Sequence, residues 1–360
     1  MMQLNDEIII ASAGSGKTTM IVDEAIKNKD KILILTYTRD NLSEIKEKFI
    51  RLNDVVPANV IIKTWFSFLL NDCARPYQNF LYDKRIKTIQ FVQSMSTRGT
   101  SMSDVENYYF NKAGMIYSDK IGGFVCKCNE ISEGLVINRL EEIYDYIYID
   151  EVQDLAGYDL ELLKLLVDSE ISVKLVGDIR QVTYSTNNAG KNRQYRDVNI
   201  INFFEKLSER QNVDLVYKNI SHRCNQKICN LADSLYPDLP DTSSLNEELT
   251  EHDGIYIIKK ENVEDYVEKF SPQILRYDKR TKLFKDKAMN FGQAKGLSFD
   301  RVLILPNGPI QKFLKTGNIK KVKKSRAKFY VALTRARYSV AFLYSGEVNL
   351  EGVENYNLNI

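Results

Sequence analysis

One short stretch, Ala11–Thr19 (ASAGSGKTT), constrains the fold of this chain more than any other. An apolar run, Ile8–Ile10, precedes it, and a segment with apolar side chains at helical spacing, Met20–Lys27, follows it. Strand, glycine-rich loop and helix in this order are typical of a phosphate-binding loop. The glycines let backbone N–H groups turn toward phosphate oxygens, where a Cβ would obstruct them. A glycine-rich turn without a ligand is the weaker interpretation, because Gly-Lys-Thr stands at the junction of strand and helix.

The polar residues of this loop have separate chemical roles. Lys17 places a positive charge near the β and γ phosphates, and the Thr18 hydroxyl is a ligand for Mg²⁺. The amino terminus of the following helix adds a favourable dipole. The sequence therefore predicts ATP and Mg²⁺ as cofactors. The residues predicted to bind the nucleotide here are Ala13, Gly14, Ser15, Gly16, Lys17, Thr18 and Thr19.

Charge and composition exclude several classes of protein. Lys and Arg total 50 against 48 for Asp and Glu, so a nucleic-acid site has to be a local patch rather than a global field. No apolar stretch approaches the ~20 residues of a membrane span, and the start of the chain lacks the pattern of a signal peptide. The five cysteines and two histidines form no pattern of metal-binding pairs. We expect no membrane partner, no structural zinc and reduced thiols in a cytoplasmic protein.

Apolar strands alternate with helices in the first half of the chain, which predicts an α/β fold with a doubly wound sheet. The expected strands include Lys31–Tyr37, Val60–Lys63 and Ser172–Asp178. The pattern is interrupted after Leu69, where Lys84–Met95 and Ser103–Asn111 are predicted helices. We therefore expect a first lobe made of residues 1–68 and 119–212, with a small helical insertion at residues 69–118.

A second chemical signal follows the apolar strand that begins at Tyr146. This strand ends in Asp150 and Glu151, within the sequence Asp-Glu-Val-Gln-Asp. After a phosphate loop, the first acid is predicted to hold Mg²⁺ and the second to polarise the water that attacks the γ-phosphate. Gln181, beyond the next strand, is predicted to sense the γ-phosphate. Read alone, either stretch is more often a solvated polar loop.

A second α/β unit is expected over residues 213–360, so that two similar lobes flank a cleft. Its predicted strands are Asp214–Tyr217, Gly254–Ile258, Lys287–Phe291, Arg301–Leu305 and Ser339–Tyr344.

The motifs, in their order, resemble those of the UvrD/Rep/PcrA-like helicases of superfamily 1, and the likeness extends over nearly the full chain. The most specific match is Asp150–Asp154, which is close to Asp-Glu-Phe-Gln-Asp. The other matching segments are Ala11–Thr18, Thr36–Thr38, Thr64–Ser67, Val176–Gln181, Ser221–Arg223, Ala294–Asp300 and Val331–Ala336.

The resemblance implies two RecA-like lobes with ATP between them. It gives Arg223 and Arg335 the role of arginine fingers, and it places His222 and Gly296 near the nucleotide. It also implies that single-stranded DNA crosses both lobes, with bases stacked on aromatic rings. The residues that the resemblance assigns to DNA are Thr36, Tyr37, Thr64, Trp65, Phe66, Tyr184 and Lys295. For Trp65 and Phe66, packing in the core is an equally good interpretation.

Departures from the family weaken the case for unwinding. Thr186 and Asn187 replace a Trp-Arg pair, and the short interval from Arg223 to Lys295 leaves no room for the large domain that the family inserts in its second lobe. We expect an ATP-dependent translocase on single-stranded DNA that moves 3′ to 5′ and unwinds poorly. One alternative is a regulatory nucleotide-hydrolysing subunit that controls a partner nuclease of the OLD-family type, as in antiphage systems such as Gabija. An RNA-directed motor is a third interpretation.

Overall fold

The chain folds into two compact units. The computed structural model describes residues 6–183, 186–187, 190–211, 213–284 and 286–356. The first unit comprises Met1–Ile10 and Lys17–Tyr217, and the second comprises Ala11–Gly16 and Lys218–Ile360. The glycine-rich loop is therefore grouped with the second unit, although the strand before it and the helix after it belong to the first.

The first unit is built on a six-stranded sheet in which five strands pair in parallel. In spatial order the strands are β3 (Val60–Thr64), β2 (Ile32–Thr36), β6 (Tyr146–Asp150), β7 (Ser172–Gly177), β1 (Glu7–Ala11) and β8 (Asp214–Lys218). The pairing register places Asp150 beside Val176, and Gly177 beside Ile10. The carboxyl ends of three neighbouring strands therefore meet at one edge, where ligands bind in sheets of this kind.

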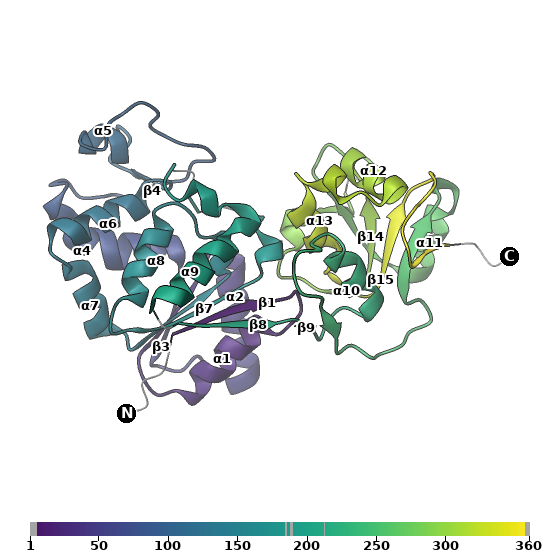
Figure 1. Ribbon diagram of the computed structural model, residues 1–360, viewed down its shortest axis with the longest axis horizontal. Coiled ribbons are helices and arrows are strands. Elements are labelled where there is room, and N and C mark those ends of the chain that lie inside the picture. The colour runs from purple at the N-terminus through teal and green to yellow at the C-terminus, as the bar shows by residue number, and fades with distance from the viewer. Residues whose placement is uncertain (1–5, 184–185, 188–189, 212, 285, 357–360) are drawn as a thin grey trace. The chain divides into compact units, whose positions relative to one another are not determined.

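Continuous apolar runs form these strands because both faces of the sheet are covered. The residues of β2 from Ile32 to Leu35 are completely buried, as expected for a parallel sheet with helices on both sides. Figure 1 shows α1 on one face and α8 and α9 on the other. The principal helices are α1 (Lys17–Lys27), α2 (Arg39–Asn53), α6 (Ile121–Ile131), α7 (Leu135–Ile143), α8 (Asp159–Val167) and α9 (Ile201–Gln211).

The inserted segment is only partly helical. A continuous helical stretch runs through α3 (Trp65–Phe68), a π-helical turn (Leu69–Ala74) and α4 (Arg75–Tyr77), and α5 (Val105–Tyr109) lies within the predicted second helix. The helix predicted over Lys84–Met95 is wrong. This stretch instead contains β4 (Ile89–Gln90), which pairs in parallel with β5 (Ile116–Tyr117). The guanidinium of Arg75 donates to the carbonyls of Ile86 and Lys87, which a helix would need for its own ladder.

The second unit contains another six-stranded sheet, and all of its pairings are parallel. In spatial order the strands are β13 (Met289–Asn290), β12 (Gln273–Arg276), β14 (Phe299–Leu305), β15 (Ala336–Leu343), β11 (Gly254–Ile258) and β16 (Val353–Asn355). The helices are α10 (Gln226–Asp233), α11 (Val263–Phe270), α12 (Gly308–Thr316) and α13 (Arg326–Leu333). The predicted α/β class with two lobes is confirmed. Of the strands expected in this unit, Asp214–Tyr217 instead lies in β8, at the edge of the first sheet.

No helix in the described part of the chain is both long and apolar enough to cross a membrane.

Candidate functional site

The glycine-rich loop connects β1 to α1 and contains two residues in the left-handed region, Gly14 at φ +78° and Gly16 at φ +82°. A Cβ at Gly14 would lie 2.6 Å from Ser221 Oγ and 2.7 Å from Arg223 Cβ, whereas a Cβ at Gly16 would meet no atom within 4 Å. Gly14 is therefore required both by its backbone conformation and by the close approach of the Ser221–Arg223 segment. The open space at Gly16 leaves the loop accessible to a ligand.

Hard oxygen donors lie next to this loop. The Thr18 hydroxyl donates to Asp150 Oδ2 at 3.1 Å. Burial raises the pKa of the Asp150 carboxyl, and the charge of Glu151 raises it further, while Lys17 and the bond from Thr18 lower it. A hydroxyl and a carboxylate at this spacing suit Mg²⁺, whose charge would offset the cost of the buried acid. Within the described residues, the buried hydroxyl of Ser15 has no hydrogen-bond partner, so it is able to donate to a phosphate oxygen. The arrangement therefore fits a magnesium nucleotide.

Glu151 is held in an unusual conformation directly after β6. Its φ of 60° and ψ of 39° lie in the left-handed region, which is strained for a residue with a side chain. Its backbone N–H donates to Asp150 Oδ1 at 2.9 Å, and its carboxylate accepts from Gln153 Nε2. These bonds fix the direction of the second acid relative to the first.

A buried hydrogen-bond network extends from Glu151 to the end of β7. Gln153 Oε1 accepts from the Asp178 backbone N–H at 3.0 Å, and Asp178 Oδ2 accepts from Gln181 Nε2 at 2.7 Å. Gln153, Asp178 and Gln181 are all buried. The predicted catalytic acid and the predicted γ-phosphate sensor thus belong to one network. Sequence reasoning assigned no role to Gln153 or Asp178, although both lie inside recognised motifs.

Gly177 allows this network to form, because an added Cβ would overlap Gln153 Oε1 and lie 3.0 Å from Val152 Cγ1. Gly177→Ala is expected to displace Gln153 and lower the kcat of ATP hydrolysis by about tenfold, the equivalent of one hydrogen bond. Gln153→Ala should have a similar effect, and the double variant should lose no more than Gln153→Ala alone. Gly308→Ala is a matched control, because its added Cβ meets no atom within 4 Å. Additive losses in the double variant would contradict the assignment.

The segment Ser221–Arg223, which follows β8, packs against the phosphate loop inside the second unit. The His222 backbone N–H donates to the Gly14 carbonyl at 2.9 Å, while the His222 imidazole is exposed. The guanidinium of Arg223, which is half-buried, donates from Nη1 to the Thr334 carbonyl at 3.0 Å. Arg223 thus stands beside the loop, where an arginine can act on a phosphate. Because the His222 imidazole is exposed, it is accessible to a nucleotide base.

Arg335 occupies a different environment from Arg223. Its side chain is buried, and it donates to the carbonyls of Val331 and Leu297, each at 3.1 Å, and to the Thr334 hydroxyl at 3.3 Å. These bonds tie α13 to the turn that contains Lys295 and Gly296. In this conformation Arg335 therefore stabilises the second unit, and the finger role that the resemblance gave it stays a prediction.

A pocket of about 400 Å³ opens where β2 and β3 end, and we call it the aromatic pocket. Tyr37, Phe66 and Phe91 line it, with ring centroids 5.9 Å apart for the first two and 5.2 Å apart for the last two. Phe91 is 64% exposed, which is unusual for a large apolar side chain that packs edge-on against a buried ring. Thr64 and Arg39 also line the pocket. Sequence reasoning missed Phe91 and Arg39, and no signal in the sequence marks either residue.

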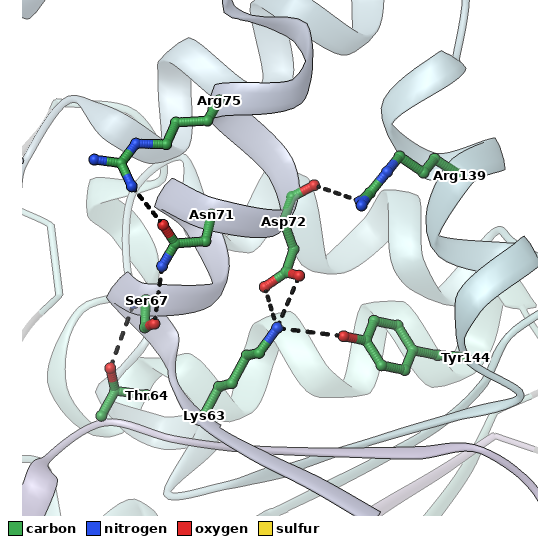
Figure 2. Close-up of polar contacts among 8 residues, drawn as sticks. All are labelled: Lys63, Thr64, Ser67, Asn71, Asp72, Arg75, Arg139 and Tyr144. Carbon is green, nitrogen blue, oxygen red and sulfur yellow. Dashed lines mark hydrogen bonds and ion pairs between the residues drawn. The ribbon is translucent and has the colours of Figure 1, made fainter. Parts of the chain in front are cut away.

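Thr64, Ser67 and Asn71 line this pocket, and Figure 2 shows the polar contacts that join them in a row. Thr64 Oγ1 accepts from the Ser67 backbone N–H, Asn71 Nδ2 donates to Ser67 Oγ at 3.2 Å, and Arg75 Nη1 donates to Asn71 Oδ1 at 2.7 Å. Behind this row, both oxygens of the Asp72 carboxylate accept from Lys63 Nζ at 2.8 Å (Figure 2). The wall is therefore fixed before a ligand arrives.

The remaining residues assigned to DNA are in other environments. Trp65 is only 1% exposed and packs against Phe68, with ring centroids 5.7 Å apart, so the structure supports core packing for this ring rather than base stacking. Thr36 is also buried, at the end of β2. Lys295 is half-buried in the second unit. Tyr184 lies outside the described residues.

Among the described residues, no group of three or more His, Cys, Asp or Glu side chains could hold a metal ion. A magnesium ion at the phosphate loop would take its other ligands from the nucleotide and water.

Two domain families match the sequence. The AAA domain family matches residues 2–187, and the viral superfamily 1 RNA helicase core domain family matches residues 136–344. Each match covers more than half of the chain. No curated protein matches the sequence.

Several solved structures are similar to this chain. The arterivirus nonstructural protein 10 helicase has 12% identity and a TM-score of 0.47, and covers 94% of this chain and 59% of its own. The PRRSV helicase has 16% identity and a TM-score of 0.45, with coverages of 94% and 52%. A complex of the arterivirus helicase with DNA has 14% identity and a TM-score of 0.46, with coverages of 94% and 61%. The chain thus spans between half and two thirds of the length of these proteins.

Proposed function

The chain belongs to the superfamily 1 helicase core domains, and we propose that it is an ATP-dependent motor that moves along single-stranded DNA in the 3′ to 5′ direction. One observation carries the proposal. The first unit holds Lys17 and Thr18 of the phosphate-loop motif, the paired acids Asp150 and Glu151, and the aromatic pocket near the carboxyl ends of the strands of one sheet. An enzyme that couples nucleotide hydrolysis to a nucleic-acid strand needs these three parts.

The nucleotide chemistry is assigned to the chain's own residues as follows. Lys17 binds the β and γ phosphates, and Glu151 accepts the proton of the attacking water. The Glu151–Gln153–Asp178–Gln181 network positions that acid and carries the state of the γ-phosphate to the end of β7. Thr18 and Asp150 would hold Mg²⁺, which neutralises charge on the phosphates when bound. Arg223 stabilises the charge that develops on the γ-phosphate.

The strand is assigned to the aromatic pocket. Tyr37, Phe66 and Phe91 supply ring faces and edges for bases, and Arg39 supplies a positive charge for the backbone. Such a platform tolerates any base sequence, because every base has a π-face. The resemblance to UvrD-like motifs favours DNA, whereas the match of residues 136–344 to viral RNA helicase cores favours RNA as a second candidate.

Phe91→Ala tests the proposal directly. We expect the variant to bind an oligothymidylate more weakly by ~1–3 kcal/mol, the contribution of one stacked base, with unchanged ATP affinity. Phe80→Ala is the matched control, because Phe80 is 46% exposed in the same inserted segment but lies outside the aromatic pocket. Fluorescence anisotropy with labelled oligothymidylate and oligouridylate measures both substrates. Equal affinities for wild type and Phe91→Ala on both strands would contradict the assignment.

Trp65→Ala separates packing from binding. Because its ring is buried, we expect the free energy of unfolding of this variant to fall by ~3–5 kcal/mol, the loss typical of a large core truncation. A Trp65→Phe variant, which keeps an apolar ring, should recover most of the stability and bind the strand normally. Differential scanning fluorimetry measures the first effect. Wild-type stability for Trp65→Ala together with weaker strand binding would restore the stacking role to Trp65.

A further inference from the structure

A second pocket of the first unit has a different chemistry from the aromatic pocket. It has a volume of about 370 Å³, and its lining includes Arg98, Arg193 and Arg196, together with Gln93 and Ser94. We propose that this arginine pocket binds phosphate groups of the same strand whose bases enter the aromatic pocket. The inference rests on the proposed function and extends it by a separate site for the backbone of the strand.

One wall of the arginine pocket is a rigid part of the insertion. The Val92 backbone N–H donates to Ser118 Oγ at 3.1 Å, and the backbone N–H and hydroxyl of Ser96 donate to the two Asp119 oxygens at 3.1 and 2.8 Å. Thr97 Oγ1 donates to the Tyr108 carbonyl at 2.9 Å. Arg98 follows these anchors directly, so the backbone that carries it is held in place.

The opposite wall is anchored to α8. Asn192, in the left-handed conformation at φ 56°, donates from Nδ2 to the Gly157 carbonyl at 2.9 Å and to Glu161 Oε1 at 2.7 Å. Arg193 begins a short 3-10 turn immediately afterwards. The two walls come from segments about a hundred residues apart in the sequence, which is why no motif reveals the site.

The positive charge of Arg98 and Arg193 makes this pocket suitable for an anion. No carboxylate is among its lining residues. Within the described residues, neither the Arg98 nor the Arg193 guanidinium has a carboxylate at salt-bridge distance, and both side chains are exposed. Guanidinium groups match phosphate oxygens in a bidentate geometry, and the Gln93 amide and Ser94 hydroxyl add neutral donors. A phosphate is therefore the ligand class that this lining recognises best.

The insertion joins the two pockets through a few residues. Phe91 lines the aromatic pocket and Gln93 lines the arginine pocket. Two residues of extended chain span no more than about 7 Å, a distance that one oligonucleotide can cover. The backbone of Phe91 therefore lies no more than about 7 Å from that of a residue that lines the arginine pocket. This continuity favours a nucleic-acid backbone over a free phosphate as the occupant.

The test is the salt dependence of oligothymidylate binding by the full chain. Each phosphate contact on a single strand contributes about 0.7 to the slope of log K against log salt. The double variant Arg98→Gln/Arg193→Gln should therefore lower the magnitude of the slope by about 1.4, and Arg98→Lys/Arg193→Lys should restore most of it. Arg51→Gln is the matched control, because Arg51 is exposed in the last turn of α2 and lines neither pocket.

The outcomes separate the two proposals. A reduced slope in the Gln variant, with a normal slope in Arg51→Gln, supports the phosphate site. Wild-type affinity and slope in the Gln variant overturn the phosphate site and leave the aromatic pocket unaffected. If inorganic phosphate binds wild type and not the Gln variant, while the slope for the oligothymidylate is unchanged, the occupant is a free anion and this inference is wrong. Absence of strand binding by wild type overturns the proposed function and this inference together.

Discussion

Lys17→Ala is expected to reduce ATP hydrolysis to the background level while the fold is retained. Lys17 is the first residue of α1, and its charge lowers the pKa of Asp150, so the ammonium lies close to the paired-acid site. Without it, the phosphates lose their only point charge from the loop, and the transition state loses its stabilisation. Lys27→Ala, at the exposed far end of the same helix, is the matched control and should keep wild-type turnover.

Glu151→Gln should fail in a different way. The amide keeps the shape of the side chain but no longer accepts a proton, so we expect bound ATP to persist without turnover. Steady-state phosphate release and binding of a fluorescent ATP analogue distinguish the two variants. Lys17→Ala should lose both signals, and Glu151→Gln should lose only the first. Near-normal turnover in either purified variant would contradict the site.

The second large effect is expected from Arg223. Because its backbone packs against Gly14 in the phosphate loop, we propose that its guanidinium leaves the Thr334 carbonyl and contacts the γ-phosphate during turnover. Arg223→Ala should lower kcat by a factor of ~10³ or more, the scale of arginine-finger losses, with a much smaller change in nucleotide affinity. Rapid-quench measurement of a single turnover gives this factor directly.

Arg335 provides the contrast within the same unit. Its guanidinium donates to the Val331 and Leu297 carbonyls, so its removal leaves buried acceptors unpaired. We expect Arg335→Ala to lower the thermal midpoint of the second unit by about 5 °C or more. Activity should fall in proportion to unfolding. A folded Arg335→Ala protein with a thousandfold loss of kcat, beside a near-normal Arg223→Ala, would reverse the two assignments.

Residues whose chemistry is local in the sequence were predictable. The phosphate loop and the acids at Asp150 and Glu151 follow apolar strands directly, and parallel pairing brings such strand ends to one edge. Recognising each motif needed only the residues next to it in the sequence. The same reasoning explains why the α/β class and most strands of both sheets were predicted.

Residues whose position depends on distant contacts were not predictable. Phe91 lies in a stretch that the sequence pattern assigned to a helix, and its place is fixed by Arg75 on one side and Ser118 on the other. For Trp65, the property that the sequence did not determine is the direction in which the ring points. This residue begins α3 immediately after the N-cap Thr64, and the turn of the chain there puts its ring in the core. Sequence spacing alone does not determine which face of such a short helix is buried.

A weak sequence signal is a third reason why an element was not predicted, and strand β12 is the example. Only Ile274 and Leu275 are apolar in its four residues, so the sequence signal is weak, yet β14 pairs with it over its whole length. For Asp214–Lys218 the strand itself was predicted, but it was assigned to the wrong sheet. Sheet membership depends on which edge is free, and that is a property of the assembled fold.

A motor of this kind couples ATP hydrolysis to movement along a single strand. The most direct measurement is the steady-state ATPase rate of the full chain on oligothymidylates of increasing length, with saturating ATP and Mg²⁺. A motor should show a rate that rises with length, because binding and release at the ends weigh less on a longer track, and Phe91→Ala should need a higher concentration of strand to reach half of the stimulation. A rate that saturates at the length of one binding site and gains nothing beyond it would contradict translocation and favour a regulatory nucleotide-hydrolysing subunit.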